Sequence, residues 1–96
     1  MSIDRQRIAH ALLDASAVLL SPDDPFTFAS GLRSPVYCDN RLLLGAVGPR
    51  RVVIEGFRQH IHDVDVLAGP ATGGIAWAAW VAEACALPMA YVPLVV

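Results

Sequence analysis

Residues 63–80, DVDVLAGPATGGIAWAAW, contain the clearest signal of the fold in this sequence. Its apolar run VDVLAG predicts a buried strand, GIAWAAWVAEACA predicts a helix, and the following PMAYVPLVV predicts a second strand. Strand, helix and strand in this order make a βαβ unit, so we expect two parallel strands joined by a right-handed crossover. The sequence therefore predicts an α/β fold.

The predicted parallel sheet is incomplete. Helices normally cover both faces of a parallel sheet, and this chain has few helices, so we expect one face or edge to stay bare. Pro93 has no backbone N–H to donate, so the last strand should lie at an edge or be irregular there.

The turn between the predicted strand and helix is rich in glycine. Gly69, Gly73 and Gly74 let a ligand approach the backbone, and a helix that begins near Ile75 would direct its free N–H groups at an anion. The turn does not match GxGxxG, and its GxxxxG spacing lacks the Lys-Ser/Thr of a P-loop. From spacing alone, a phosphate site and a simple tight turn both remain open.

The N-terminal half predicts a helix and a hairpin. Ser2 can cap a helix that carries Asp4 in its first turn and ends near Ser16. FTFASG and SPVYCDN then predict two short strands around Gly31. Further on, Pro49 suits the first position of a second helix, whose apolar face would contain Val53, Phe57 and Ile61.

Composition limits the function classes. The chain has 96 residues, 17% of them charged, a formal net charge of −2 and no lysine, so nothing indicates binding to nucleic acid. No window is long and apolar enough to span a membrane, and no signal peptide is recognisable, which predicts a cytoplasmic protein without a membrane partner. Cys38 and Cys85, far apart in the sequence, fit reduced thiols better than a disulfide.

Two residue pairs have competing interpretations. Trp77 and Trp80 could form a stacking platform, but packing against a neighbouring strand or subunit is the expected role. His60 and His62 point in different directions on a helix, so a metal site is not expected there.

Two motifs resemble the orotate phosphoribosyltransferase family. PFTFASGLRSPVYCDNRLLL, residues 25–44, is similar to its N-terminal hairpin, F-x-x-x-S-G-x-x-S-P-x-Y/F, and LAGPATGGIAWAAWVAEACALPMAYV is similar to its pyrophosphate loop, helix and strand. The resemblance extends to about Val92. It implies a partial type I phosphoribosyltransferase fold with an N-terminal helix and a hairpin hood.

The resemblance also implies an activity and its site. Such enzymes are Mg²⁺-dependent glycosyltransferases of pyrimidine (UMP) biosynthesis, dimeric when complete, and they convert orotate and phosphoribosyl pyrophosphate to orotidine 5′-monophosphate and pyrophosphate. By resemblance, Ser30, Gly31 and Tyr37 would bind orotate. The backbone of Ala71, Thr72, Gly73 and Gly74 would bind the pyrophosphate.

The sequence departs from the family after Val92. Family members continue with Arg and Lys residues into a mobile catalytic loop and later a paired-acid, Thr-rich motif, whereas here PLVV follows. Many members also have a lysine where this chain has Ala29. We therefore expect no catalytic residue and no metal ligand in this chain.

The expected object is a single incomplete domain, a truncated enzyme fragment that is inactive alone. Residues 1–48 would carry the helix and the hood, and residues 49–96 a helix and the first βαβ unit. The alternative is a non-catalytic binding or interaction module derived from the same fold, which a stable, defined oligomer would favour. A relative that acts on a purine base is disfavoured by the Ser-Gly-x-x-Ser-Pro hairpin.

Overall fold

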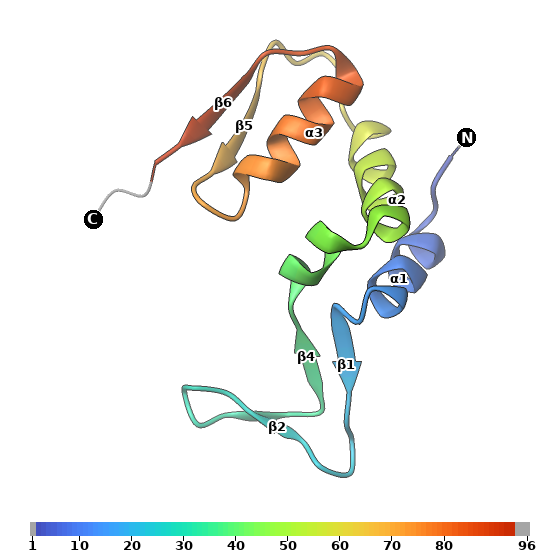
Figure 1. Ribbon diagram of the computed structural model, residues 1–96, viewed down its shortest axis with the longest axis vertical. Coiled ribbons are helices and arrows are strands. Elements are labelled where there is room, and N and C mark those ends of the chain that lie inside the picture. Colours follow the sequence, from blue (N-terminus) through green and yellow to red (C-terminus); the bar gives the residue numbers. More distant parts are fainter. Residues whose placement is uncertain (1, 94–96) are drawn as a thin grey trace.

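The computed structural model describes residues 2–93 and shows an α/β chain in which two arms extend from α1 and α2: residues 18–45 form one arm and residues 67–92 the other (Figure 1). In chain order, the elements are α1 (Arg5–Asp14), β1 (Val18–Leu20), β2 (Phe26–Thr27), β3 (Arg33–Ser34), β4 (Val36–Cys38), the 3₁₀ helix η1 (Asn40–Gly45), α2 (Val47–Arg58), β5 (Leu67–Pro70), α3 (Ile75–Cys85) and β6 (Met89–Val92). The strand predicted from PMAYVPLVV is confirmed as β6 up to Val92, and residues 94–96 lie outside the described residues.

The first helix is capped by a different residue from the one expected. The side chain of Asp4, not Ser2, accepts a hydrogen bond of 2.8 Å from the backbone N–H of Arg7. A carboxylate at this position also interacts favourably with the positive end of the helix dipole. The helix ends at Asp14, slightly earlier than predicted.

The predicted hairpin is present, but its second strand is divided. β2 pairs with β3 in antiparallel register, with Phe26 opposite Ser34. β4 turns away and pairs with β1, which aligns Leu19 with Tyr37. We call residues 26–38 the hood. Figure 1 shows that its β2–β3 part extends away from the helices beyond the β1–β4 ladder.

Helix α2 begins earlier than predicted. It starts at Val47, so Pro49 occupies its third position rather than its first. Proline is tolerated at the third position as well as at the first. The first four N–H groups of a helix have no intrahelical acceptor, so the missing N–H of proline removes no hydrogen bond there. η1, which precedes α2, was not predicted.

The βαβ unit is confirmed as a parallel pair. β5 and β6 run parallel, with Leu67 opposite Met89 and Pro70 opposite Val92, and α3 connects them. The expectation of a buried strand is wrong: of the four β5 residues only Gly69 is buried, because among the described helices α3 alone packs against both strands.

The core is small and lies around the three helices. Its buried apolar side chains belong to Ile3, Ala11, Ala17, Leu43, Val81 and Ala82. The radius of gyration is 15.5 Å, against about 13 Å for a compact domain of 100 residues. The chain is thus more open than a finished domain of its size.

Candidate functional site

The turn after β5 leaves backbone donors free. Residues 71–74, which we call the phosphate turn, are anchored at both ends: the N–H of Ala71 donates to the carbonyl of Val92 at 2.8 Å, and that of Gly74 donates to Pro70 at 2.8 Å. Between them, the N–H groups of Thr72 and Gly73 donate to no other residue within 2–93. α3 begins directly afterwards, so the positive end of its helix dipole lies beside these two donors.

Close packing explains two of the three glycines near this turn. A Cβ at Gly69 would collide with the carbonyl oxygen of Gly74 and lie 2.7 Å from the Cβ of Ala78. A Cβ at Gly74 would collide with the ring of Pro70. Gly73 has no heavy atom within 4 Å of such a Cβ, so open space lies beside the donor that it carries.

The structure also shows a cis peptide bond between Ala71 and Thr72. Thr72 and Gly73 are exposed, and Ala71 and Gly74 are half-buried. The sequence-predicted turn residues therefore form one accessible surface at the start of α3.

The hood combines an aromatic cluster with a tight turn. Tyr37 lies between two rings, with centroid distances of 5.6 Å to Phe26 and 6.3 Å to Phe28. Gly31 has a φ of 89°, in the region that favours glycine, and its N–H donates to the carbonyl of Phe28 at 2.9 Å. The Ser30 hydroxyl accepts a hydrogen bond of 3.4 Å from the N–H of Leu32.

The two groups of predicted site residues lie on different arms. Ser30, Gly31 and Tyr37 are together in the hood, and the phosphate turn lies at the end of β5 (Figure 1). An apolar groove of about 350 Å³ lies between α2, β5 and α3, and its walls include Phe57, Trp77 and Val81. Its lining is apolar, so it does not suit a phosphate.

Within residues 2–93 the tryptophan pair packs against helix α2, and its expected packing against a strand or subunit stays a prediction. Trp77 and Trp80 meet edge to face at 5.4 Å. Trp77 also lies 6.4 Å from Phe57 of α2, and Trp80 lies under the guanidinium group of Arg50. Within residues 2–93 these rings therefore join α2 to α3.

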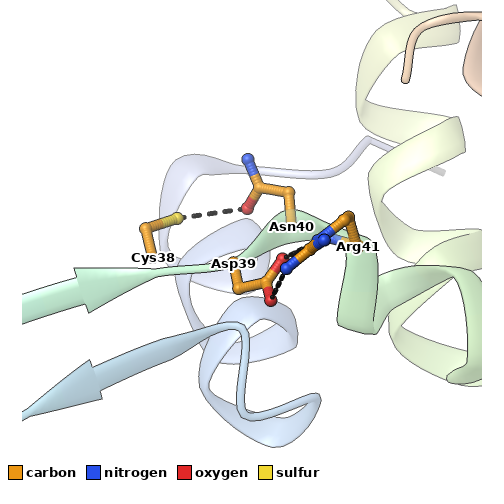
Figure 2. A network of polar contacts seen from close by, with 4 residues as sticks. All are labelled: Cys38, Asp39, Asn40 and Arg41. Atoms are coloured by element: carbon orange, nitrogen blue, oxygen red, sulfur yellow. Dashed lines mark hydrogen bonds and ion pairs between the residues drawn. The ribbon is translucent and has the colours of Figure 1, made fainter. Parts of the chain in front are cut away.

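A polar network at the junction of β4 and η1 was missed by the sequence analysis (Figure 2). Asp39 caps η1 and accepts two side-chain hydrogen bonds from Arg41, at 2.8 and 2.9 Å, while the Cys38 thiol donates to Asn40 at 3.2 Å. The hydrogen bond from Arg41 lowers the pKa of Asp39 below its ordinary value, and the reciprocal contact raises the pKa of Arg41. The available signal was an Asp directly after a strand and before a helical turn.

Other candidate features carry no site. Across residues 2–93, no three His, Cys, Asp or Glu side chains gather where they could hold a metal ion. Cys38 and Cys85 are both free thiols. None of the described helices has the length and apolar character needed to cross a membrane.

The fold and the turn together define a class of α/β protein: a parallel βαβ unit whose strand-to-helix turn has the geometry used to bind phosphate. No family model matches the chain. Individual relatives narrow the class considerably.

Curated relatives match almost the whole chain. It is 50% identical over 92 residues to the orotate phosphoribosyltransferase of Halalkalibacterium halodurans, an alignment that covers 92% of the chain and 44% of the relative. It is also 50% identical over 96 residues to the orotate phosphoribosyltransferase of Listeria monocytogenes serotype 4b, covering 96% of the chain and 46% of the relative.

Solved structures agree. Orotate phosphoribosyltransferase from Aeropyrum pernix superposes with a TM-score of 0.72 at 33% identity, covering 93% of the chain and 51% of that structure. The chain therefore corresponds in sequence and fold to the N-terminal part of orotate phosphoribosyltransferases. It spans about half the length of these relatives, and its sheet is partial relative to the full fold.

Proposed function

We propose that this chain is the substrate-binding N-terminal half of an orotate phosphoribosyltransferase. The observation that carries the proposal is the pair of free N–H groups at Thr72 and Gly73, at the start of α3. The chain that contains them is 50% identical in sequence to a named member of that family. In the complete enzyme, orotate would displace pyrophosphate from phosphoribosyl pyrophosphate and form orotidine 5′-monophosphate for pyrimidine biosynthesis.

In this proposal the phosphate turn binds the pyrophosphate group. Thr72 and Gly73 present free backbone N–H groups, and the hydrogen bonds of Ala71 and Gly74 to Val92 and Pro70 hold both ends of the turn in place around them. Hydrogen bonds from N–H groups to a charged acceptor are stronger than those to a neutral one. The open space beside Gly73 supports this role, because a bulky ligand can approach its N–H directly.

The hood would bind orotate, a flat heteroaromatic anion. Tyr37 and its two phenylalanine neighbours offer an aromatic wall against which such a ring can pack. Ser30 and Gly31 form the exposed tip of the turn, where hydroxyl and backbone groups can meet the carboxylate and carbonyl oxygens of the ligand.

The chain alone supplies little for the chemical step. It has no lysine, and its described acidic and histidine residues form no metal-binding cluster, so they do not fit a Mg²⁺ site. The Mg²⁺ implied by the resemblance would instead accompany the phosphates of the substrate, as is usual for this ion. We propose that the 96-residue chain binds ligand without turnover, and that the complete enzyme is a cytoplasmic homodimer.

Isothermal titration calorimetry of the chain with phosphoribosyl pyrophosphate tests the turn. Gly73→Pro removes one N–H donor, and Gly73→Ala keeps it in a site with room for the methyl group. A lost hydrogen bond to a charged group is worth about 1.5–3 kcal/mol, so the proline variant should bind about 10- to 150-fold more weakly. The alanine variant should bind like the unaltered chain.

Three results would contradict the proposal. Absence of binding heat with phosphoribosyl pyrophosphate and with orotate would remove the ligand-binding role altogether. Equal weakening by alanine and proline at Gly73 would show that the donor itself is not used. Formation of orotidine 5′-monophosphate by the chain, with contaminating enzyme excluded, would refute the expected lack of turnover.

A further inference from the structure

Arg50 connects the two arms of the proposed site. Its Nη1 donates a hydrogen bond of 2.8 Å to the carbonyl of Leu44, near the end of η1. The central carbon of its guanidinium group lies 4.5 Å from the ring centre of Trp80 in α3. One side chain in the first turn of α2 thus contacts both the segment that follows the hood and the helix that follows the phosphate turn.

The two arms of the described chain do not pack directly against each other. Within residues 2–93, packing joins α1 to α2 and, more weakly, to β1, η1 to α2, and α2 to α3, whereas the hood strands make no such packing with α3 or β5. The packing of the helices therefore determines the orientation of the hood relative to the phosphate turn, and α2 is the central helix. A residue that fixes η1 and α3 to α2 acts on that orientation.

The contact made by Arg50 is specific to arginine. A planar guanidinium group can stack on an aromatic face while its N–H groups donate in its own plane, whereas an ammonium is a compact, strongly hydrated charge with no plane to stack. The Nε of Arg50 is buried and has no hydrogen-bond partner among the described residues, so the hydrogen bond from Nη1 and the stacking on Trp80 are the contacts that hold this group.

The ring that Arg50 contacts is itself held in place. Trp80 packs edge to face with Trp77, at an interplanar angle of 85°, and Trp77 in turn packs against Phe57 of α2. Movement of Arg50 relative to α3 would disturb this series of rings.

We infer that Arg50 is a positioning residue that sets the orientation of the hood relative to the phosphate turn. It needs no contact with either ligand. The inference rests on the proposed function, because the orientation has a consequence for catalysis only if one pair of bound ligands contacts both arms.

Distance measurement between spin labels tests the inference without ligand. Labels at Leu32→Cys in the exposed hood tip and Ala79→Cys on the exposed side of α3, with Cys38→Ser and Cys85→Ser, report the orientation of the two arms. Arg50→Met keeps the length of the side chain but not its charge or donors. We expect its distance distribution to be at least about twofold broader at unchanged helix content by circular dichroism.

Two further variants make the test decisive. Arg51→Met removes an exposed charge from the next position of α2, for which we expect no change in the distribution. Arg50→Lys restores the charge but not the planar stacking on Trp80, so it should give an intermediate width. Unchanged widths in folded Arg50→Met overturn the inference; if Arg50→Met does not fold, an unchanged width in Arg50→Lys overturns it.

A binding experiment separates this inference from the proposed function. Orotate and phosphoribosyl pyrophosphate are titrated singly and together by calorimetry. For Arg50→Met, we expect single-ligand affinities within about twofold of the unaltered chain, and loss of any gain in affinity that one ligand gives the other. If the unaltered chain binds neither ligand, the proposed function fails, while the label distances still decide whether Arg50 orients the arms.

Discussion

Gly69 is the position at which a single methyl group should matter most. In the structure a Cβ there collides with the Gly74 carbonyl oxygen and lies 2.7 Å from the Ala78 Cβ, so Gly69→Ala must separate β5 from α3. Overpacking of this kind costs about 1–3 kcal/mol, and the lower entropy of the unfolded alanine chain returns about 0.4–1 kcal/mol. The expected net loss of about 1–2 kcal/mol lowers the unfolding temperature by about 4–16 °C for a domain of this size.

Urea unfolding followed by tryptophan fluorescence measures this loss, since both tryptophans of the chain lie in α3. Gly73→Ala is the matched control, because the same methyl group there meets no heavy atom within 4 Å. We expect the control to unfold at or slightly above the midpoint of the unaltered chain. Equal midpoints for Gly69→Ala and Gly73→Ala would refute the close approach of β5 and α3.

Three further predictions follow from the hydrogen bonds and backbone angles. Asp4→Ala should destabilise the chain by about 1 kcal/mol in urea unfolding, whereas Ser2→Ala should leave it unchanged because Asp4 caps α1. Gly31→Ala places a side chain at a φ of 89°, which costs about 1–2 kcal/mol, so calorimetry should show orotate binding weakened about tenfold. The pKa of Asp39 is lowered from 3.8 by the hydrogen bond from Arg41, so its stabilisation is present above that value and is lost as pH falls below it; unfolding midpoints between pH 7 and 3 should show a smaller acid loss for Asp39→Asn.

The βαβ unit could be predicted because its signals are local. The apolar run before Gly69 and the helix-forming sequence after Gly74 indicate strand and helix without reference to the remainder of the chain. The degree of burial could not be predicted in the same way. An apolar strand sequence indicates that other elements cover the strand. Which helices or strands pack on it depends on the complete fold, and in this chain β5 is largely exposed.

Strand pairing in the hood needed information from a distant segment. The sequence indicates strands on both sides of Gly31, and a hairpin is the simplest pairing. Tyr37 instead pairs with Leu19, because β4 brings the chain back alongside β1, the strand that precedes the hood. The aromatic cluster around Tyr37 depends on that pairing, so the sequence identified the residue but not its neighbours.

Capping and cation–π contacts were the least predictable features. Ser2 and Asp4 both precede the first helix and both have side chains that can cap it, so only backbone geometry distinguishes them. Arg50 and Trp80 are thirty positions apart on different helices, and no spacing rule links them. The tight connection at residues 71–74 could be predicted because glycine spacing between a strand and a helix is a signal within a single segment, whereas its phosphate-binding role stays a prediction.

The hood contains none of the buried apolar residues of the described chain. Short ladders and exposed aromatic rings hold its shape, so on the proposed function a bound orotate ring would act as the hood's own core. Ordering of the hood would then bury protein surface as well as ligand surface. The heat capacity change on binding would be more negative than the small area of orotate alone can account for.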